Sequence, residues 1–258
     1  NLNNIYNHMN IRLIWFVALM ISLFSCKPQY RIVDMQGEII EIDSTFDSKP
    51  NPHIQKLVLS YKTQLDSEMN IPIGTSASLM DYRRPESLLT NLTSDVMKEY
   101  GDEHLPNGAD IGVMNVHGHR ATMPKGTVTI GNLFEIYSFD NTITFLDLKG
   151  VDLKKMFDAY ARIGGAGISS NVKLIIENRQ VKSVTVDNKP IDNNQIYKIV
   201  TLDYLAEGND NMNALLNAIS SNNTGVTLRD IMIDWVKEQT RMGNEIESAI
   251  DGRIIIIE

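Results

Sequence analysis

Residues 53–258 alternate, without a fixed period, between stretches of helical periodicity and short apolar runs of strand length. Apolar residues at helical spacing predict an amphipathic helix, whereas a short apolar run between turn residues predicts a strand. Because the two kinds of segment alternate irregularly and include one predicted hairpin, they favour a mixed sheet with helices packed on it over a doubly wound parallel sheet. The sequence therefore predicts one α+β domain over residues 53–258.

The expected elements of this domain follow from the two patterns. Helices are expected at 53–70, 86–100, 133–137, 151–163, 212–219 and 228–242. Strands are expected at 109–115, 142–148, 172–177, 181–186, 197–202 and 253–257, with the third and fourth forming a hairpin. The sequence contains no internal repeat that would indicate a second copy of the same unit.

The first 26 residues have the pattern of an export signal. Arg12 precedes an apolar run at 13–24 that is too short to span a membrane comfortably. The run ends in Leu23-Phe24-Ser25-Cys26, which resembles the lipobox of bacterial lipoproteins. Because the chain has one cysteine, Cys26 has no intramolecular disulfide partner, and lipidation after signal cleavage gives it a purpose.

A polar, proline-containing stretch at 27–52 follows the cysteine and is predicted to be a tether. One short strand is expected within it, at either 30–34 or 38–42. Together, signal and tether predict an exported bacterial lipoprotein of the cell envelope, which faces the periplasm or is anchored in the outer membrane.

The charge balance excludes one class of partner. A net charge of −8 and a pI near 5.2 argue against a nucleic-acid polymer, because binding to its phosphate backbone requires a concentrated basic surface. A small anionic ligand remains compatible with this charge, since two well-placed arginines suffice to bind it.

Histidines are too few to indicate a metal-dependent hydrolase. His117 and His119 form an H-x-H pair in a loop, but a two-metal centre requires several further ligands. Only His8, His53 and His104 remain. We therefore expect no metal ligands and no cofactor in this chain.

A polar loop after the predicted strand 109–115 is the first candidate for ligand binding. Such a strand delivers Asn115 and Arg120 to the edge of the sheet, where ligands bind in many α/β proteins. The planar guanidinium of Arg120 matches phosphate or carboxylate oxygens. An ordinary surface arginine explains this loop equally well.

Two aromatic residues lie in further loops at strand ends. Phe139 precedes the predicted strand 142–148, and Tyr204 follows the predicted strand 197–202. Two rings in such positions can sandwich a purine or pyrimidine base. Taken singly, each ring is more typical of a half-buried packing residue.

Ordered motifs then resemble a known family. They are ADIGVMN at 109–115, GTVTIGNLF at 126–134, SFDNTI at 138–143, KGVDLKKMF at 149–157 and YKIVTLDYLAEGND at 197–210. Over roughly residues 54–258 the sequence resembles the C-terminal, nucleotide-binding domain of the 5′-nucleotidase family, which implies that domain's fold. In that family this domain binds the nucleoside and helps to hold the phosphate, whereas a separate N-terminal metallophosphoesterase domain carries two metals and the catalytic groups.

The resemblance implies substrate-binding roles on the phosphate side of the site. Asn115 and Arg120 match the Asn and Arg of the family's NGGGIR loop. Arg83 stands where the family has another substrate-binding arginine, with Arg84 as the alternative because the local alignment is loose.

The resemblance also implies a nucleoside pocket. Phe139 and Asn141 match the family's P-F-x-N stretch, whose Phe stacks on the base. Tyr204 matches the second stacking ring, and Asp210 matches the ribose-binding Asp of the family's GGDG turn.

Two loops depart from the family pattern. Val116, His117, Gly118 and His119 replace three glycines and an isoleucine, and side chains at the first two positions are expected to crowd a ligand. The second loop reads GNDN at 208–211 in place of GGDG. Because asparagine tolerates positive φ, this turn is expected to survive.

These observations support one leading hypothesis and two alternatives. The leading hypothesis is the nucleotide- or nucleoside-binding subunit of a split 5′-nucleotidase-like hydrolase in nucleotide catabolism, with divalent metals only in a separate metallophosphoesterase partner. The first alternative is a stand-alone lipoprotein that binds a small ligand without catalysis. The second is a structural protein whose pocket has decayed. Whether the chain takes part in an enzyme is left open.

Overall fold

The computed structural model describes residues 15, 30–37, 39 and 51–257. Apart from residue 15, the predicted signal peptide lies outside these residues, as do Cys26, most of the tether and most of the candidate strand 38–42. The other candidate strand, 30–34, has no regular secondary structure. Within the described part of the chain, no helix is long and apolar enough to cross a membrane.

The chain divides into two units, Asn1–Ile54 and Gln55–Glu258, and the second contains the fold. Its central five-stranded sheet has the strand order β10-β4-β9-β2-β5. The strands are β2 (Ile111–Met114), β4 (Thr142–Lys149), β5 (Gly167–Ile168), β9 (Ile196–Leu202) and β10 (Ser220–Thr227). Strand β9 runs parallel to β2 and antiparallel to β4, so the predicted mixed sheet is confirmed.

Two smaller sheets accompany the central one. A four-stranded sheet has the order β11-β6-β7-β8, and a two-stranded sheet pairs β1 with β3. Their strands are β1 (Pro72–Ser76), β3 (Gly126–Thr129), β6 (Val172–Glu177), β7 (Gln180–Val186), β8 (Lys189–Pro190) and β11 (Ile254–Ile257). The predicted hairpin is β6–β7, and Asn178 and Arg179 form its turn with positive φ at both residues.

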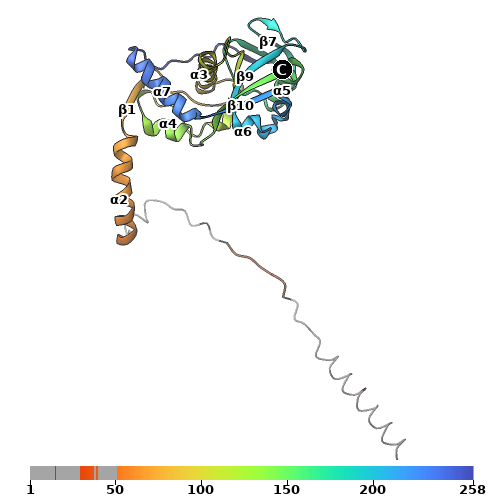
Figure 1. Cartoon of the computed structure of the whole chain (residues 1–258). Coiled ribbons are helices and arrows are strands. Elements are labelled where there is room, and N and C mark those ends of the chain that lie inside the picture. The colour runs from red at the N-terminus through yellow and green to blue at the C-terminus, as the bar shows by residue number, and fades with distance from the viewer. Residues whose placement is uncertain (1–14, 16–29, 38, 40–50, 258) are drawn as a thin grey trace, which may run out of the picture. The chain divides into compact units, whose positions relative to one another are not determined.

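Three long helices cover these sheets (Figure 1): α3 (Leu88–His104), α5 (Gly150–Ile163) and α7 (Leu228–Arg241). Helix α3 begins at a capping box of Ser87 and Thr90, and packs against β2 and β5. Helix α5 contacts both β9 and β7, which places it between the two larger sheets, and it ends at Gly164 in the left-handed conformation. Helix α7 packs on β1, α3 and the short helix α4 (Ile130–Ile136).

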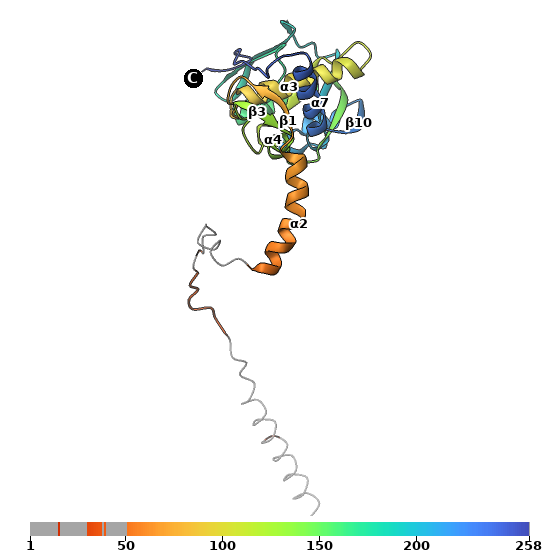
Figure 2. The same cartoon turned by 90° about the vertical axis from the view of Figure 1, so that its left-hand side faces the viewer.

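Helix α2 (Pro52–Met69) confirms the predicted helix at 53–70 (Figure 2), but none of its residues is buried. Six of its apolar residues are more than half exposed, namely Ile54, Leu57, Val58, Leu59, Tyr61 and Leu65. Helical periodicity indicates that one face is apolar without indicating what covers it. The buried core begins only at Ile73.

Several other elements differ from expectation. The predicted helix 212–219 is the shorter 3-10 helix η4 (Asn213–Asn217), and the strands β1, β3, β5, β8 and β10 were not predicted. Strand β10 lies at the sheet edge with mostly exposed, polar side chains. It pairs with β4 through backbone groups. Its side chains do not alternate between apolar and polar, so periodicity gives no signal for this strand.

A buried arginine joins three of these elements. Arg253, directly before β11, is 3% exposed and donates hydrogen bonds to Asp95 of α3 and to Asp251. Its Nη1 also donates to the backbone carbonyl of Ile168 in β5, at 2.8 Å. Because both carboxylates balance its charge, this ion-pair group holds the C-terminal strand against the helix side of the central sheet.

Candidate functional site

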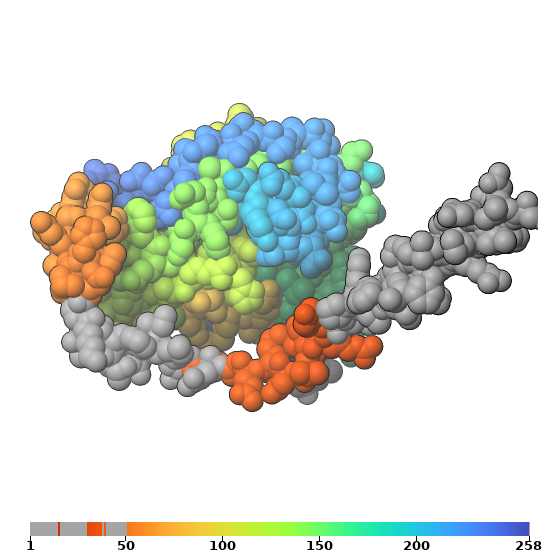
Figure 3. Space-filling model, turned by 90° about the horizontal axis from the view of Figure 1, so that it is seen from below, coloured from red at the N-terminus to blue at the C-terminus, as the bar shows by residue number. Residues whose placement is uncertain are grey.

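The strand directions bring three separate loops to one edge of the central sheet. Strands β2 and β9 are parallel and both end at this edge, whereas the antiparallel β4 begins there. The loops therefore contain residues 115–120 after β2, residues 203–211 after β9, and residues 139–141 before β4. The segments around α4 and α6 (Asp203–Ala206) lie side by side on this face (Figure 3).

A cavity of about 310 Å³ opens between these loops. Its lining residues are Asn115, His117, Gly118, Arg120, Phe139, Asn141, Tyr204 and Asp210. Six of the seven substrate-binding residues expected from the sequence are therefore brought together. The seventh, Arg83, does not line this cavity; its guanidinium pairs with Asp81 on the surface.

Arg84, the neighbour of Arg83, lies beside the candidate site. A second cavity of about 140 Å³ shares Asn115, His117 and Asp210 with the first, and Arg84 lines it. The Nε of Arg84 donates to the carbonyl oxygen of Gly165 at 2.9 Å, and its Nη1 lies 3.2 Å from Nε2 of His117. The structure thus favours Arg84, the alternative in the loosely aligned segment.

Asp210 is the polar centre of the cavity. Its carboxylate accepts a hydrogen bond from Asn115 Nδ2 at 2.6 Å and another from the Tyr204 hydroxyl at 3.1 Å. The hydrogen bond to Asp210 raises the pKa of Tyr204 above its ordinary value, so the phenol stays protonated. A carboxylate can accept about four hydrogen bonds, which leaves Asp210 capacity for hydroxyl groups of a ligand.

The two expected stacking rings are both accessible. Phe139 is 43% exposed and Tyr204 is 38% exposed, and both line the cavity. The guanidinium carbon of Arg120 lies 4.8 Å from the centroid of the Phe139 ring, which is cation–π distance. The cavity therefore combines ring surface with a positive charge at its border.

Helix α7 holds the loop that carries Phe139. Arg229 donates to the carbonyl oxygen of Tyr137 at 3.0 Å and pairs with Asp140, while the backbone N–H of Leu228 donates to the carbonyl oxygen of Asn141 at 3.0 Å. Sequence reasoning missed Arg229, since nothing in its local pattern distinguishes it from a surface arginine.

The altered loop after β2 is less obstructive than expected. The expectation for Val116 is wrong, because this side chain is 2% exposed and packs in the core. His117 lines both cavities, and the crowding expected there stays a prediction. A Cβ at Gly118 would lie 2.7 Å from Asn115 Oδ1 and 2.6 Å from Met114 Cε, so a larger residue there would have to displace the ends of these two side chains.

His119 points away from the cavity, into the core. Its Nε2 lies 2.9 Å from Thr93 Oγ1, which also lies 2.7 Å from the Tyr137 hydroxyl, and its Nδ1 lies 3.0 Å from the carbonyl oxygen of Val116. Burial lowers the pKa of His119 to about 4, although the hydrogen bond to Val116 opposes this shift. His119 is therefore neutral at pH 7, and it links the binding loop to α3 and to the end of α4.

The turn after Tyr204 keeps a left-handed backbone despite its substitutions. Gly208, Asp210 and Asn211 have φ values of 84°, 53° and 65°. The expectation that asparagine would allow positive φ here is confirmed at Asn211. This conformation directs the Asp210 carboxylate toward Asn115 and Tyr204.

The His119 network generates a prediction about acid stability. Between pH 6.5 and pH 4 the unfolded chain binds a proton at this histidine that the folded protein does not, so stability falls by up to about 3 kcal/mol as the pH decreases. We expect His119→Leu to be about 1–3 kcal/mol less stable at pH 7.5, through loss of the Thr93 hydrogen bond, and to lose stability less steeply below pH 6.5.

Urea unfolding at pH 7.5, 5.5 and 4.5 measures both effects. The exposed His53→Leu variant is the matched control and should follow the wild-type pH dependence. An unchanged pH dependence in His119→Leu would contradict the assignment.

Comparison with known proteins agrees with this architecture. The solved structure of a 5′-nucleotidase precursor from Thermus thermophilus has the same fold, with a TM-score of 0.70 and 24% identity, over 82% of this chain and 45% of that one. The chain is 23% identical over 216 residues to the protein UshA of Yersinia enterocolitica, which covers 81% of this chain and 39% of that protein.

A 5′-nucleotidase of Diplobatis ommata is 27% identical over 201 residues, 68% of this chain and 34% of that protein. The chain thus spans less than half the length of each of these relatives. The family model described as 5′-nucleotidase, C-terminal domain matches residues 68–217, more than half of the chain. The chain therefore belongs to the 5′-nucleotidase C-terminal domain family.

Proposed function

We propose that this chain is the nucleotide-binding subunit of a split 5′-nucleotidase-like hydrolase of nucleotide catabolism. The observation that carries the proposal is the 310 Å³ cavity, in which two accessible rings, a carboxylate and an arginine converge from three loops. This combination matches the parts of a nucleotide: a flat base, a sugar with hydroxyl groups and an anionic phosphate.

The nucleoside occupies the part of the cavity between Phe139 and Tyr204. A base is stabilised by stacking on these rings, at about 1–3 kcal/mol per stacked base. Asp210 accepts hydrogen bonds from ribose hydroxyls, because its carboxylate is already oriented by Asn115 and Tyr204. Asn141 lines the same cavity and supplies an amide for polar groups of the base or sugar.

The phosphate lies toward Arg120 and Arg84. Arg120 borders the main cavity and Arg84 borders the adjoining one, with Asn115 and His117 shared between the two. Guanidinium groups bind phosphate through paired, charge-assisted hydrogen bonds. The two arginines therefore hold the phosphate where a second protein can reach it.

Hydrolysis itself is assigned to a separate metallophosphoesterase chain. This assignment places the divalent metals in that partner and leaves binding and orientation to the present chain. The lipobox-like segment ending at Cys26 supports membrane anchoring of this subunit in the cell envelope.

The aromatic pair generates a prediction for ligand affinity. Phe139→Ala and Tyr204→Ala are each expected to weaken binding of adenosine roughly ten- to hundredfold, because each removes one stacking surface. Titration calorimetry measures the change, with the exposed Tyr61→Ala of α2 as the matched control. Tight adenosine binding that neither cavity substitution alters would refute the stacking arrangement.

The two adjacent arginines provide an internal comparison. Arg84→Ala is expected to weaken binding of adenosine 5′-monophosphate at least tenfold while leaving adenosine affinity nearly unchanged, since it removes a charged hydrogen-bond donor to the phosphate. Arg83→Ala, whose guanidinium pairs with Asp81, is expected to change neither affinity. The reverse pattern would assign the phosphate contact to Arg83.

The split arrangement is tested by phosphate release. We expect no release from adenosine 5′-monophosphate with this chain alone, and release when a metallophosphoesterase without its own C-terminal domain is added with divalent metal. Turnover by this chain alone is the result that contradicts the proposal. Nucleotide binding without turnover in any pairing favours the stand-alone binding lipoprotein instead.

A further inference from the structure

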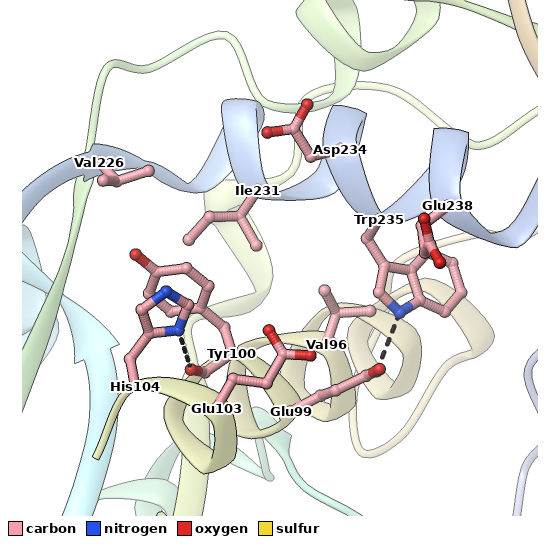
Figure 4. Close-up of a pocket in the computed structure, with 10 residues that line it drawn as sticks. All are labelled: Val96, Glu99, Tyr100, Glu103, His104, Val226, Ile231, Asp234, Trp235 and Glu238. Carbon is pink, nitrogen blue, oxygen red and sulfur yellow. Dashed lines mark hydrogen bonds between the residues drawn. The ribbon is translucent and has the colours of Figure 1, made fainter.

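A third and larger cavity lies away from the candidate site, between α3, α7 and the end of β10. Its volume is about 480 Å³, which is within the range of small-molecule pockets. Its lining residues are Val96, Glu99, Tyr100, Glu103, His104, Val226, Ile231, Asp234, Trp235 and Glu238 (Figure 4). None of them belongs to the cavities that contain Asp210.

We call the cavity lined by these ten residues the acidic groove. Its base is apolar and aromatic. Val96 and Ile231 are buried beneath it, and Trp235 and Tyr100 present partly exposed rings. The indole Nε1–H of Trp235 donates to Glu99 across the groove at 2.9 Å, linking the two helices (Figure 4). This hydrogen bond fixes the ring of Trp235 along the α7 wall.

Carboxylates line both walls. Glu99 and Glu103 are four residues apart on α3, and Asp234 and Glu238 are four residues apart on α7. No lysine or arginine is among the lining residues. Like charges at this spacing destabilise a helix by a few tenths of a kcal/mol, a cost that a bound cation would offset on both walls.

The charges of the groove are only partly balanced. Glu238 pairs with Arg241, and Glu99 accepts the indole hydrogen bond. Within the described residues, neither Glu103 nor Asp234 has an ion-pair partner. Burial and the nearby charge of Glu103 both raise the pKa of Tyr100, consistent with a negative potential in the groove.

We infer that the acidic groove binds a linear aliphatic polyamine. Carboxylates four residues apart on a helix are separated by roughly 6 Å along its axis. Within the described residues, no three His, Cys, Asp or Glu side chains converge closely enough to hold a metal ion. The spacing of the carboxylates therefore matches ammonium groups distributed along a chain better than it matches a single metal cation.

The apolar base complements the remainder of such a ligand. Methylene segments pack on Ile231, Val226 and the Tyr100 ring, and an ammonium group over the Trp235 face gains a cation–π contact. Ammonium groups then reach Glu103 on one wall and Asp234 on the other. The inference does not depend on nucleotide binding, because the groove shares no residue with that site.

Titration of the full chain with spermidine tests the inference. We expect one saturable site, with affinity weakened at least tenfold by Glu103→Gln and by Asp234→Asn, and severalfold by Trp235→Phe. Glu135→Gln makes the same change of charge at an exposed position of α4 outside the groove and is expected to leave affinity unchanged. Unchanged thermal unfolding midpoints verify that the variants are folded.

Three outcomes overturn the inference. Absence of saturable binding does so directly. Equal weakening by Glu135→Gln shows general attraction to a chain of net charge −8 rather than a site. Binding of a lysine-rich peptide without binding of spermidine shows that the groove accepts a protein segment instead. Adenosine titrations of the same variants are expected to match the wild type, which separates this result from that of the proposed function.

Discussion

The parallel pairing of β2 with β9 is the constraint on which the candidate site depends. These strands are far apart in the sequence, and the chain between them forms β4, α5 and the β6–β7 hairpin. Because β2 and β9 point the same way and β4 points the opposite way, the loops containing Asn115, Tyr204 and Phe139 open at one edge. A change in this strand order would disperse the cavity without altering any of its residues.

Residues outside the cavity then fix the positions of its loops. His119 joins the Arg120 loop to α3 and α4 through Thr93 and Tyr137, and it does so as a neutral, buried imidazole. Arg229 fixes the loop of Phe139 from α7. Such supports reduce the conformational freedom that a ligand would otherwise have to restrict on binding.

The substitutions in the glycine loops show that close approach matters at specific positions only. A Cβ at Gly118 would displace the ends of the Met114 and Asn115 side chains, whereas Val116 directs its side chain into the core. Asn211 adopts the positive φ that a glycine would provide. Two substitutions change the cavity surfaces, because His117 lines both cavities and Asn211 lines the smaller one. His117 also contacts Arg84 where the two cavities adjoin.

The sequence by itself determined the α+β class, most of the helices and strands, and six residues that share one cavity, because apolar periodicity is local and the motifs are ordered along the chain. It could not decide between Arg83 and Arg84, because the two neighbours carry the same side chain and differ only in the direction in which it points. Nor did it indicate β10, whose pairing uses backbone groups, or Arg229, whose partners are about ninety residues away. The exposure of α2 and the acidic groove between α3 and α7 were likewise decided by tertiary packing, because burial and the meeting of two helix faces are properties of the assembled fold.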